Sequence, residues 1–290
     1  MNFRSNKVTD IREYYDSLLQ QNFSHKESLI QLDMILEEYF GISKTKRVLN
    51  SGLRLSESEI LKIHFAVKQL LNNKPIQYVL NKCYFHGLSF FVDERVLIPR
   101  PETEEMVGMI LNNSKLGHSN TRVLDIGTGS GCVAVTLKHS FPDVSVWAMD
   151  VSEEALDVAR KNALDLHVNV NFINDDILSP LKTDQLPLFD VIVSNPPYVR
   201  LSETTTMKPN VLDYEPALAL FVPDDDPLIF YRKIILFSQV KLLQGGFLYF
   251  EINRDFADQT MELLCSNGFG NVEVHKDFNG NSRFVVANKL

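Results

Sequence analysis

The sequence predicts an α/β protein whose doubly wound, mostly parallel sheet is preceded by a smaller, all-α part. Residues 8–72 contain only patterns of helical period, in which apolar residues recur every three or four positions. From residue 121 onward, apolar segments of strand length alternate with segments of helix length. This alternation is typical of parallel strands joined by helices that cover both faces of a sheet. A length of 290 residues suits two domains.

The first 74 residues (1–74) are predicted to form an N-terminal helical bundle. Two capping boxes, Ser24 with Glu27 and Ser56 with Glu59, mark the starts of helices. Apolar residues follow both boxes at helical spacing: Leu29, Ile30, Leu32, Ile35 and Leu36 after the first, and Ile60, Leu61, Ile63, Phe65, Ala66, Leu70 and Leu71 after the second. Because this part has no glycine-rich loop, we expect it to recognise a partner rather than to carry chemistry.

Residues 75–100 are predicted to form a linker built around a β-hairpin. Pro75 ends the helical pattern, and two short strands, 84–85 and 88–92, flank a His-Gly turn. The remaining residues, 101–290, are predicted to form the α/β domain. Its expected strands are 123–126, 144–149, 168–173, 190–194, 247–252, 272–274 and 284–287, and its expected helices are 132–138, 153–163, 227–243 and 256–265. The last two strands follow each other without a helix, which predicts an antiparallel end to the sheet.

The composition argues against several classes of protein. The formal net charge is −8, and residues 81–290 carry 18 Lys and Arg against 28 Asp and Glu. Nucleic-acid binders normally present a basic surface, so nucleic acid is not the expected substrate. No apolar run reaches the roughly 20 residues of a membrane-spanning helix. The three cysteines are scattered and the seven histidines lack metal-binding spacing. We therefore expect a cytoplasmic enzyme with no metal and no membrane partner.

A glycine-rich loop follows the first strand of the α/β domain, and acids follow the next two strands. The loop consists of Gly127, Thr128, Gly129, Ser130 and Gly131. Glycines at this spacing let the backbone turn tightly and approach a ligand at the carboxyl edge of a parallel sheet. Asp150 is placed to accept hydrogen bonds from ribose hydroxyls, and Asp176 with Ile177 to hold an adenine ring. A nicotinamide site would need Gly or Ala where Cys132 stands, which argues against a dehydrogenase.

The tetrapeptide Asn195-Pro196-Pro197-Tyr198 follows the strand 190–194 at the same edge of the sheet. Two prolines fix the backbone and remove two N–H donors, which leaves carbonyl oxygens free to accept. The Asn195 side-chain oxygen and the Pro196 carbonyl are suited to hold both N–H bonds of a planar NH2 group, and Tyr198 is suited to stack on it. Such positioning would turn the nitrogen lone pair toward an electrophilic methyl group.

The loop and the acids resemble the S-adenosylmethionine site of class I methyltransferases, and the tetrapeptide resembles that of enzymes that methylate planar nitrogens. Three segments upstream look like the signature of bacterial peptide chain release factor N5-glutamine methyltransferases: Pro75-Ile76-Gln77-Tyr78, Tyr84-Phe85-His86-Gly87-Leu88, and Leu97-Ile98-Pro99-Arg100-Pro101-Glu102-Thr103-Glu104. Three later segments continue the match: Tyr214-Glu215-Pro216-Ala217-Leu218, Gly245-Gly246-Phe247-Leu248, and Asp277 with Gly280 and Arg283.

The resemblance implies a Rossmann-like class I fold and transfer of a methyl group from S-adenosyl-L-methionine to N5 of the glutamine in the Gly-Gly-Gln motif of release factors, with S-adenosyl-L-homocysteine as product. It implies that Gly127 to Gly131, Asp150, Asp176, Ile177 and Asn195 bind the cofactor. The catalytic residues would be Asn195, Pro196, Pro197 and Tyr198, and the substrate would contact these four together with Arg100, Glu102, Tyr214 and Glu215. Ile177 departs from better-known members, which place a bulky aromatic there, and this predicts an altered affinity for adenine.

Two alternatives stay open on the tetrapeptide alone. One is methylation of a ribosomal-protein glutamine, although those enzymes typically have Pro-Arg-Ser-Pro where this chain has Pro99-Arg100-Pro101-Glu102. The other is methylation of adenine or guanine amino groups in nucleic acid, which would need a basic cleft that the acidic C-terminal part does not indicate.

Overall fold

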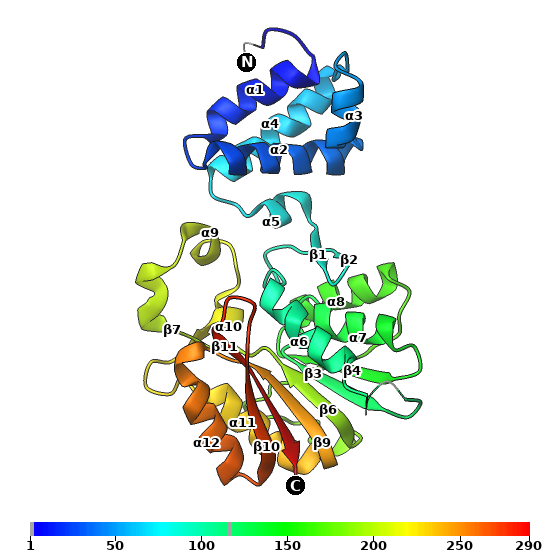
Figure 1. Cartoon of the computed structure of the whole chain (residues 1–290), viewed down its shortest axis with the longest axis vertical. Helices are drawn as coiled ribbons and strands as arrows, with labels where there is room; N and C mark the ends of the chain where they lie inside the picture. Colours follow the sequence, from blue (N-terminus) through cyan, green and yellow to red (C-terminus); the bar gives the residue numbers. More distant parts are fainter. Residues whose placement is uncertain (1–2, 115, 117) are drawn as a thin grey trace. The chain divides into compact units, whose positions relative to one another are not determined.

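The computed structural model describes residues 3–114, 116 and 118–290. The chain divides into two compact units (Figure 1). The helical unit comprises Met1–Lys82 with Lys208–Tyr214, and the α/β unit comprises Cys83–Met207 with Glu215–Leu290. The segment 75–100, expected to link two domains, is thus divided between the units, and residues 208–214 join the helical unit from far along the chain.

The helices of the helical unit are α1 (Val8–Leu19), α2 (His25–Phe40), α3 (Lys44–Leu49), α4 (Glu57–Leu71), α5 (Ile76–Leu80) and α9 (Pro209–Leu212). Its apolar core lies between α1, α2, α4 and α5. Both predicted capping boxes are present. In the first box the Ser24 hydroxyl accepts from the Glu27 N–H, and the Glu27 carboxylate accepts from the Ser24 N–H. Three residues that we assigned to apolar faces are about half exposed: Ile30 (50%), Leu61 (47%) and Phe65 (55%).

The α/β unit confirms the predicted mixed sheet. Its main sheet, as formed by the described residues, has seven strands in the order β10-β11-β9-β6-β3-β4-β5. The strands are β3 (Arg122–Ile126), β4 (Ser145–Asp150), β5 (Asn171–Asn174), β6 (Phe189–Ser194), β9 (Leu242–Glu251), β10 (Phe269–Lys276) and β11 (Ser282–Lys289). Strands β9, β6, β3, β4 and β5 are parallel, and β11 and β10 add the antiparallel end.

Helices cover both faces of this sheet (Figure 1). The helices α6 (Pro101–Leu111), α7 (Cys132–Ser140) and α8 (Glu153–Asp165) share one core cluster with alternate strand residues such as Val123 and Val146. The helices α11 (Ile229–Lys241) and α12 (Ala257–Ser266) pack on the opposite face with residues such as Leu124 and Ile192. Successive residues of a strand therefore point alternately into the two cores on opposite faces of the sheet, as expected for a doubly wound sheet.

The shorter elements of the α/β unit lie in its connections. The predicted hairpin consists of β1 (Cys83–Phe85) and β2 (Leu88–Phe90), which pair antiparallel. After β6 the chain forms β7 (Val199–Arg200), a short helical turn over 201–206, α10 (Ala217–Leu220) and β8 (Phe221–Val222), and β7 pairs with β8 in parallel. Single helical turns also occur at 183–185 and 254–256.

Several predicted boundaries differ from the structure, and two of these errors are informative. The strand expected at 168–173 begins only at Asn171. The helix expected over 227–243 ends at Lys241, and β9 begins directly at Leu242 instead of at residue 247. The pairing with β6 explains the second error, because Phe189 pairs with Leu242 whereas Val191 pairs with Phe247. The extra β9 residues form an irregularity in the pairing at two glycines. Because the apolar run continues across the end of α11, the sequence pattern did not show where the helix ends and the strand begins.

Gly131 and Gly108 provide a matched test of packing in the α/β unit. Gly131 has φ +79°, and an added Cβ would lie 3.0 Å from the Cβ of Ala159 in α8, whereas no described atom lies within 4 Å of a Cβ added to Gly108 in α6. Gly131→Ala is expected to lower the free energy of unfolding by about 1–3 kcal/mol. Gly108→Ala is expected to raise it by about 0.5–1 kcal/mol. Urea denaturation followed by Trp147 fluorescence measures both free energies of unfolding. Equal changes in the two variants would show that Gly131 is not required to be glycine by its contact with α8.

Candidate active site

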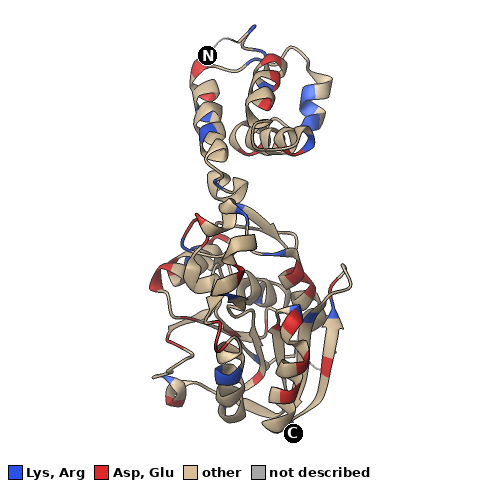
Figure 2. Cartoon of the chain, turned by 90° about the vertical axis from the view of Figure 1, so that its left-hand side faces the viewer, with Lys and Arg blue, Asp and Glu red and all other residues tan. Residues whose placement is uncertain are grey.

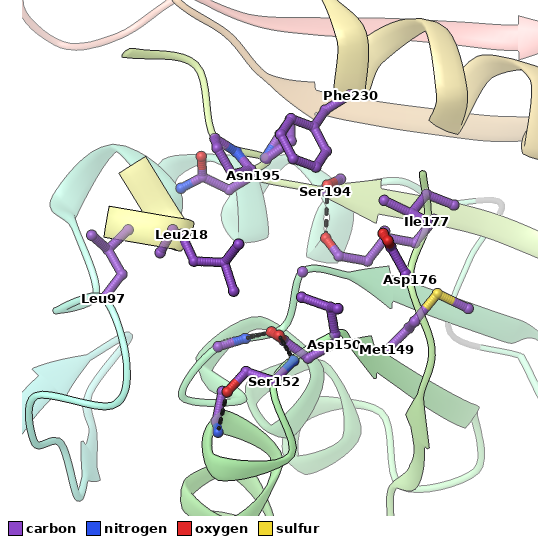
Figure 3. Close-up of a pocket in the computed structure, with 18 of the residues that line it drawn as sticks. Leu97, Met149, Asp150, Ser152, Asp176, Ile177, Ser194, Asn195, Leu218 and Phe230 are labelled. Carbon is purple, nitrogen blue, oxygen red and sulfur yellow. Dashed lines mark hydrogen bonds between the residues drawn. The ribbon is translucent and has the colours of Figure 1, made fainter. Parts of the chain in front are cut away.

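A pocket lies at the carboxyl ends of β3, β4, β5 and β6 (Figure 3). The predicted site residues that line it are Gly127, Gly129, Asp150, Asp176, Ile177, Asn195, Pro196 and Pro197. Apolar side chains that were not predicted to belong to the site complete the wall, among them Leu97, Leu218 and Phe230 (Figure 3). The structure therefore gathers loops that are up to about 130 residues apart at one edge of the sheet, as expected for an open parallel sheet.

The glycine loop is tied to the end of β4. The N–H groups of Gly127 and Thr128 both donate to the Met149 carbonyl, at 2.9 and 3.0 Å, and the Gly129 N–H donates to the Asp150 carboxylate at 2.8 Å. Gly127 and Gly129 have φ values of +75° and +53°, which favour glycine. Backbone without side chains thus faces the pocket at these two positions.

The other three loop residues serve the loop itself. Thr128 is buried and donates to the Asp125 carboxylate at 2.6 Å. Burial raises the pKa of Asp125 to about 7, although the Thr128 hydroxyl acts to lower it. Ser130 is buried, its carbonyl accepts from Asn162 at 2.9 Å, and Gly131 packs on α8. None of these three is among the described residues that line the pocket.

Asp150 presents a fixed carboxylate to the pocket. One oxygen accepts from the Gly129 N–H at 2.8 Å and the other from the Ser152 N–H at 3.0 Å (Figure 3). Burial raises the pKa of Asp150, and these two N–H groups act to lower it. Each carboxylate oxygen has lone pairs for more than one donor. Asp150 therefore keeps capacity to accept from a ligand hydroxyl while its position is set by the backbone.

Asp176 and Ile177 form another part of the pocket wall. The Asp176 carboxylate accepts from the Leu178 N–H at 2.9 Å, which fixes the turn after β5. The Ile177 side chain is buried and packs with Met149 and other residues of the core beneath the sheet edge. A flat apolar ring has a matching surface here, next to a carboxylate that can accept from an amino group.

The Asn-Pro-Pro-Tyr segment follows β6, whose last residue, Ser194, donates to the Ile126 carbonyl at 2.7 Å. Asn195 Nδ2 donates to Thr103 Oγ1 at 3.1 Å. The Tyr198 hydroxyl donates to Glu251 at 3.1 Å, and Tyr198 is not among the described residues that line the pocket. Burial, followed by the charge of Glu251, raises the pKa of Tyr198. The expected stacking of this ring on a substrate stays a prediction.

Four of the residues expected to contact substrate are not among the described residues that line the pocket: Arg100, Glu102, Tyr214 and Glu215. Glu215 is buried and accepts from the Ile98 N–H at 3.2 Å and from Arg100 at 2.5 Å. Glu102 lies in the first turn of α6. Tyr214 belongs to the helical unit, where its hydroxyl donates to the Asn72 carbonyl at 2.7 Å. The structure thus gives Glu215 a role in holding the segment before α6, and substrate contacts of these residues stay predictions.

Two other properties concern the described residues only. No group of three or more His, Cys, Asp or Glu side chains in the described ranges is arranged to hold a metal ion. No helix within those ranges is both long and apolar enough to cross a membrane.

The fold and this pocket define a class I S-adenosylmethionine-dependent methyltransferase. A solved methyltransferase from Pyrococcus furiosus shares the fold, with a TM-score of 0.51 and 21% identity over 77% of this chain and 96% of that one. A family model described as Methyltransferase small domain matches residues 108–212, and one described as PrmC N-terminal domain matches residues 11–80.

The chain belongs to the release factor glutamine methyltransferase family. It is 43% identical over 283 residues to the release factor glutamine methyltransferase of Flavobacterium psychrophilum, which covers 97% of this chain and 99% of the relative. It is 40% identical over 279 residues to the enzyme of that name from Bacteroides thetaiotaomicron, covering 96% and 99%. These similarities confirm the family that the sequence motifs indicated.

Proposed function

We propose that this protein transfers a methyl group from S-adenosyl-L-methionine to the side-chain amide nitrogen (N5) of the glutamine in the Gly-Gly-Gln motif of release factors. Nearly full-length similarity to enzymes named for release factor glutamine supports the substrate class. The observation that carries the chemistry is the position of Asn195 and Pro196 in the wall of the pocket that holds the glycine loop. An acceptor of amide N–H bonds thus lies within the cofactor pocket itself.

The pocket residues fit the cofactor. Gly127 and Gly129 offer backbone that a ligand can approach, and the Asp150 carboxylate is suited to ribose hydroxyls. Asp176 and Ile177 are suited to an adenine amino group and ring. When bound, S-adenosylmethionine supplies a methyl group on a positively charged sulfur. The apolar wall of Leu97, Leu218 and Phe230 limits the access of water to that group.

The substrate amide is proposed to bind at the Asn-Pro-Pro corner. The Asn195 side-chain oxygen and the Pro196 carbonyl accept its two N–H bonds, and the prolines present no competing N–H. An amide nitrogen is a poor nucleophile because its lone pair is delocalised into the carbonyl. Two fixed acceptors polarise the NH2 group and orient it, which lowers the barrier by positioning and preorganised electrostatics rather than by a strong base.

The function is tested by incubating the purified protein and labelled S-adenosylmethionine with three substrates in parallel: an intact release factor, ribosomal protein and nucleic acid. We expect one methyl group on the Gly-Gly-Gln glutamine, located by mass spectrometry, and none when that glutamine is replaced by alanine. Labelling of ribosomal protein or nucleic acid in preference to the release factor would overturn the proposed substrate. Figure 2 shows Asp and Glu distributed over the α/β unit, which makes nucleic acid the least favoured of the three.

The helical bundle of residues 1–74 is proposed to recognise the release factor. Leu61 and Phe65 lie one turn apart in α4, so their half-exposed side chains share a face. Leu61 also borders a depression lined by Phe3 and Ile60. An apolar surface of this kind is typical of a protein contact.

Phe65→Ser is expected to raise KM for an intact release factor by about tenfold, the scale expected when one aromatic side chain is removed from an interface. Its kcat, and KM for a short Gly-Gly-Gln peptide, should not change, because the peptide lacks the part of the release factor that is proposed to bind the bundle. Val240→Ser in α11 is the matched control, since Val240 is also exposed and apolar but lies in the α/β unit. An equal rise in KM for both variants, or none for Phe65→Ser, would remove this surface from the proposal.

A further inference from the structure

We propose that Glu251 and Thr103 are positioning residues that hold the Asn195 amide with its oxygen toward the pocket. This inference rests on the proposed function, because it concerns the residue assigned to accept the substrate amide. Thr103 lies in the first turn of α6, Asn195 directly follows β6, and Glu251 is the last residue of β9. Three elements that are distant in sequence thus place these side chains in one chain of hydrogen bonds.

The centre of this chain of hydrogen bonds, Thr103 and Glu251, is buried, whereas Asn195 and Tyr198 at its ends are partly exposed. Thr103 is 4% exposed and Glu251 is 1% exposed. The Thr103 hydroxyl donates to one Glu251 oxygen at 2.7 Å, and the Tyr198 hydroxyl donates to the other at 3.1 Å. Asn195 Nδ2 donates to Thr103 Oγ1 at 3.1 Å. Pairing of the buried Thr103 hydroxyl and Glu251 carboxylate favours one arrangement, because breaking these bonds leaves a buried donor or acceptor without a partner.

The direction of these hydrogen bonds follows from the chemistry of the groups. A carboxylate only accepts, so the single hydroxyl proton of Thr103 points to Glu251. Thr103 Oγ1 then has only lone pairs left for Asn195, and of the two ends of an amide only the nitrogen can donate to a lone pair. The Asn195 oxygen is therefore turned away from Thr103. The negative charge of Glu251 sets this orientation through two hydrogen bonds.

This orientation decides what Asn195 can do at the pocket. With its oxygen turned away from Thr103, the side chain can accept an N–H bond of an incoming amide. With the amide reversed, it would meet the donor NH2 of the substrate with its own donor NH2. Glu251 at the end of β9 thus orients the Asn195 oxygen at the end of β6 as an acceptor. Neither Thr103 nor Glu251 needs to contact the substrate.

The first test uses methyl transfer to a release factor. Thr103→Val, which keeps the shape and removes the hydroxyl, is expected to lower kcat by about 10–100-fold, the usual scale for loss of a group that orients a functional side chain. Its KM and its Kd for S-adenosylmethionine should stay unchanged. Thr103→Ser, which restores a hydroxyl, should recover most of the activity. The matched control is Thr136→Val in α7, because Thr136 is also fully buried and its hydroxyl has no partner among the described residues.

A merely structural role is separated by combining variants. If Thr103 acts through Asn195, Thr103→Val adds no loss of kcat when Asn195 is already alanine. A further loss in that double variant, or full activity of Thr103→Val alone, would overturn the inference. Glu251→Gln gives a second approach, since the glutamine NH2 can donate to Thr103 and so permit Thr103 to donate to a reversed Asn195. It should therefore also lower kcat, without the loss of a side chain from the core.

The second test does not depend on the substrate. In a nitrogen-15 NMR spectrum, the side-chain NH2 signals of Asn195 are identified by their absence from the Asn195→Ala variant. We expect slow exchange of an NH2 proton with water in the wild type and faster exchange in Thr103→Val and Glu251→Gln, but not in Thr136→Val. Exchange at the wild-type rate in the first two variants would overturn the inference. Failure of the wild type to methylate release factors would instead overturn the proposed function, and the exchange rates would still decide the orientation of Asn195.

Discussion

Asn195→Ala is expected to lower the single-turnover rate of methyl transfer at saturating cofactor by about 10²–10³-fold, the usual effect of removing one preorganised polar group that faces the reacting atoms. In the proposed mechanism the side-chain oxygen accepts an N–H of the target amide, and alanine offers no acceptor in its place. The affinity for S-adenosylmethionine should change much less, because Gly127, Asp150 and Asp176, which line the pocket after β3, β4 and β5, are proposed to hold that ligand.

Asn195→Asp distinguishes the acceptor from the side chain as a whole. Aspartate keeps an acceptor and brings a negative charge that favours the cationic nitrogen formed on attack, but it is costly to desolvate and cannot donate to Thr103. Its rate is therefore expected to fall between those of the wild type and Asn195→Ala. An alanine variant that turns over as fast as the wild type would show that the acceptor role of Asn195 is wrong.

Asp150→Ala is expected to weaken the binding of S-adenosylmethionine by about 1–3 kcal/mol, the scale of a charge-assisted hydrogen bond left unmade. The loss has two sources in the structure. The carboxylate is the expected acceptor for the ribose hydroxyls, and it also holds the Gly129 N–H and thereby the glycine loop. Isothermal calorimetry with the cofactor alone measures the change without a contribution from the protein substrate.

Two further variants control this measurement. Asp150→Asn keeps an acceptor without the charge and should bind with intermediate affinity. Asp157→Ala in α8 removes an exposed carboxylate that pairs with Arg160, outside the described pocket lining, and should bind as the wild type does. Wild-type affinity in Asp150→Ala would show that Asp150 is not the ribose acceptor, whatever the outcome for Asn195.

The sequence predicted the site best where a short local pattern had a direct structural reason. Gly127, Gly129 and Asp150 were found because a tight turn and an acid at the end of a strand can be recognised within a few residues. Gly131 carries the same pattern, but its need for glycine comes from the neighbouring α8 rather than from the pocket. Spacing alone does not distinguish these two reasons, because both require a residue without Cβ.

Thr103 and Glu251 were not predicted as functional residues, although Glu251 had a signal. Like Asp150, it is an acid at the carboxyl end of a strand, but the strand was expected to run to residue 252, which placed Glu251 inside the strand rather than at its end. Thr103 lies in the signature segment 97–104, but no local pattern indicated its role, since its partners are 92 and 148 residues away. The connection after β6 was equally hard to predict, because its short elements have no period that a sequence pattern could detect.

The assignment of residues 208–214 to the helical unit has a consequence for exchanging specificity between relatives. The polypeptide passes between the units three times, after Lys82, Met207 and Tyr214, so the helical unit is not a single terminal cassette. A chimera that transplants only the first 82 residues would join a foreign bundle to a native α9 and break the pairing of Tyr214 with the Asn72 carbonyl. A chimera should therefore exchange both segments of the helical unit together. For the same reason we expect the bundle and α9 to change together among relatives.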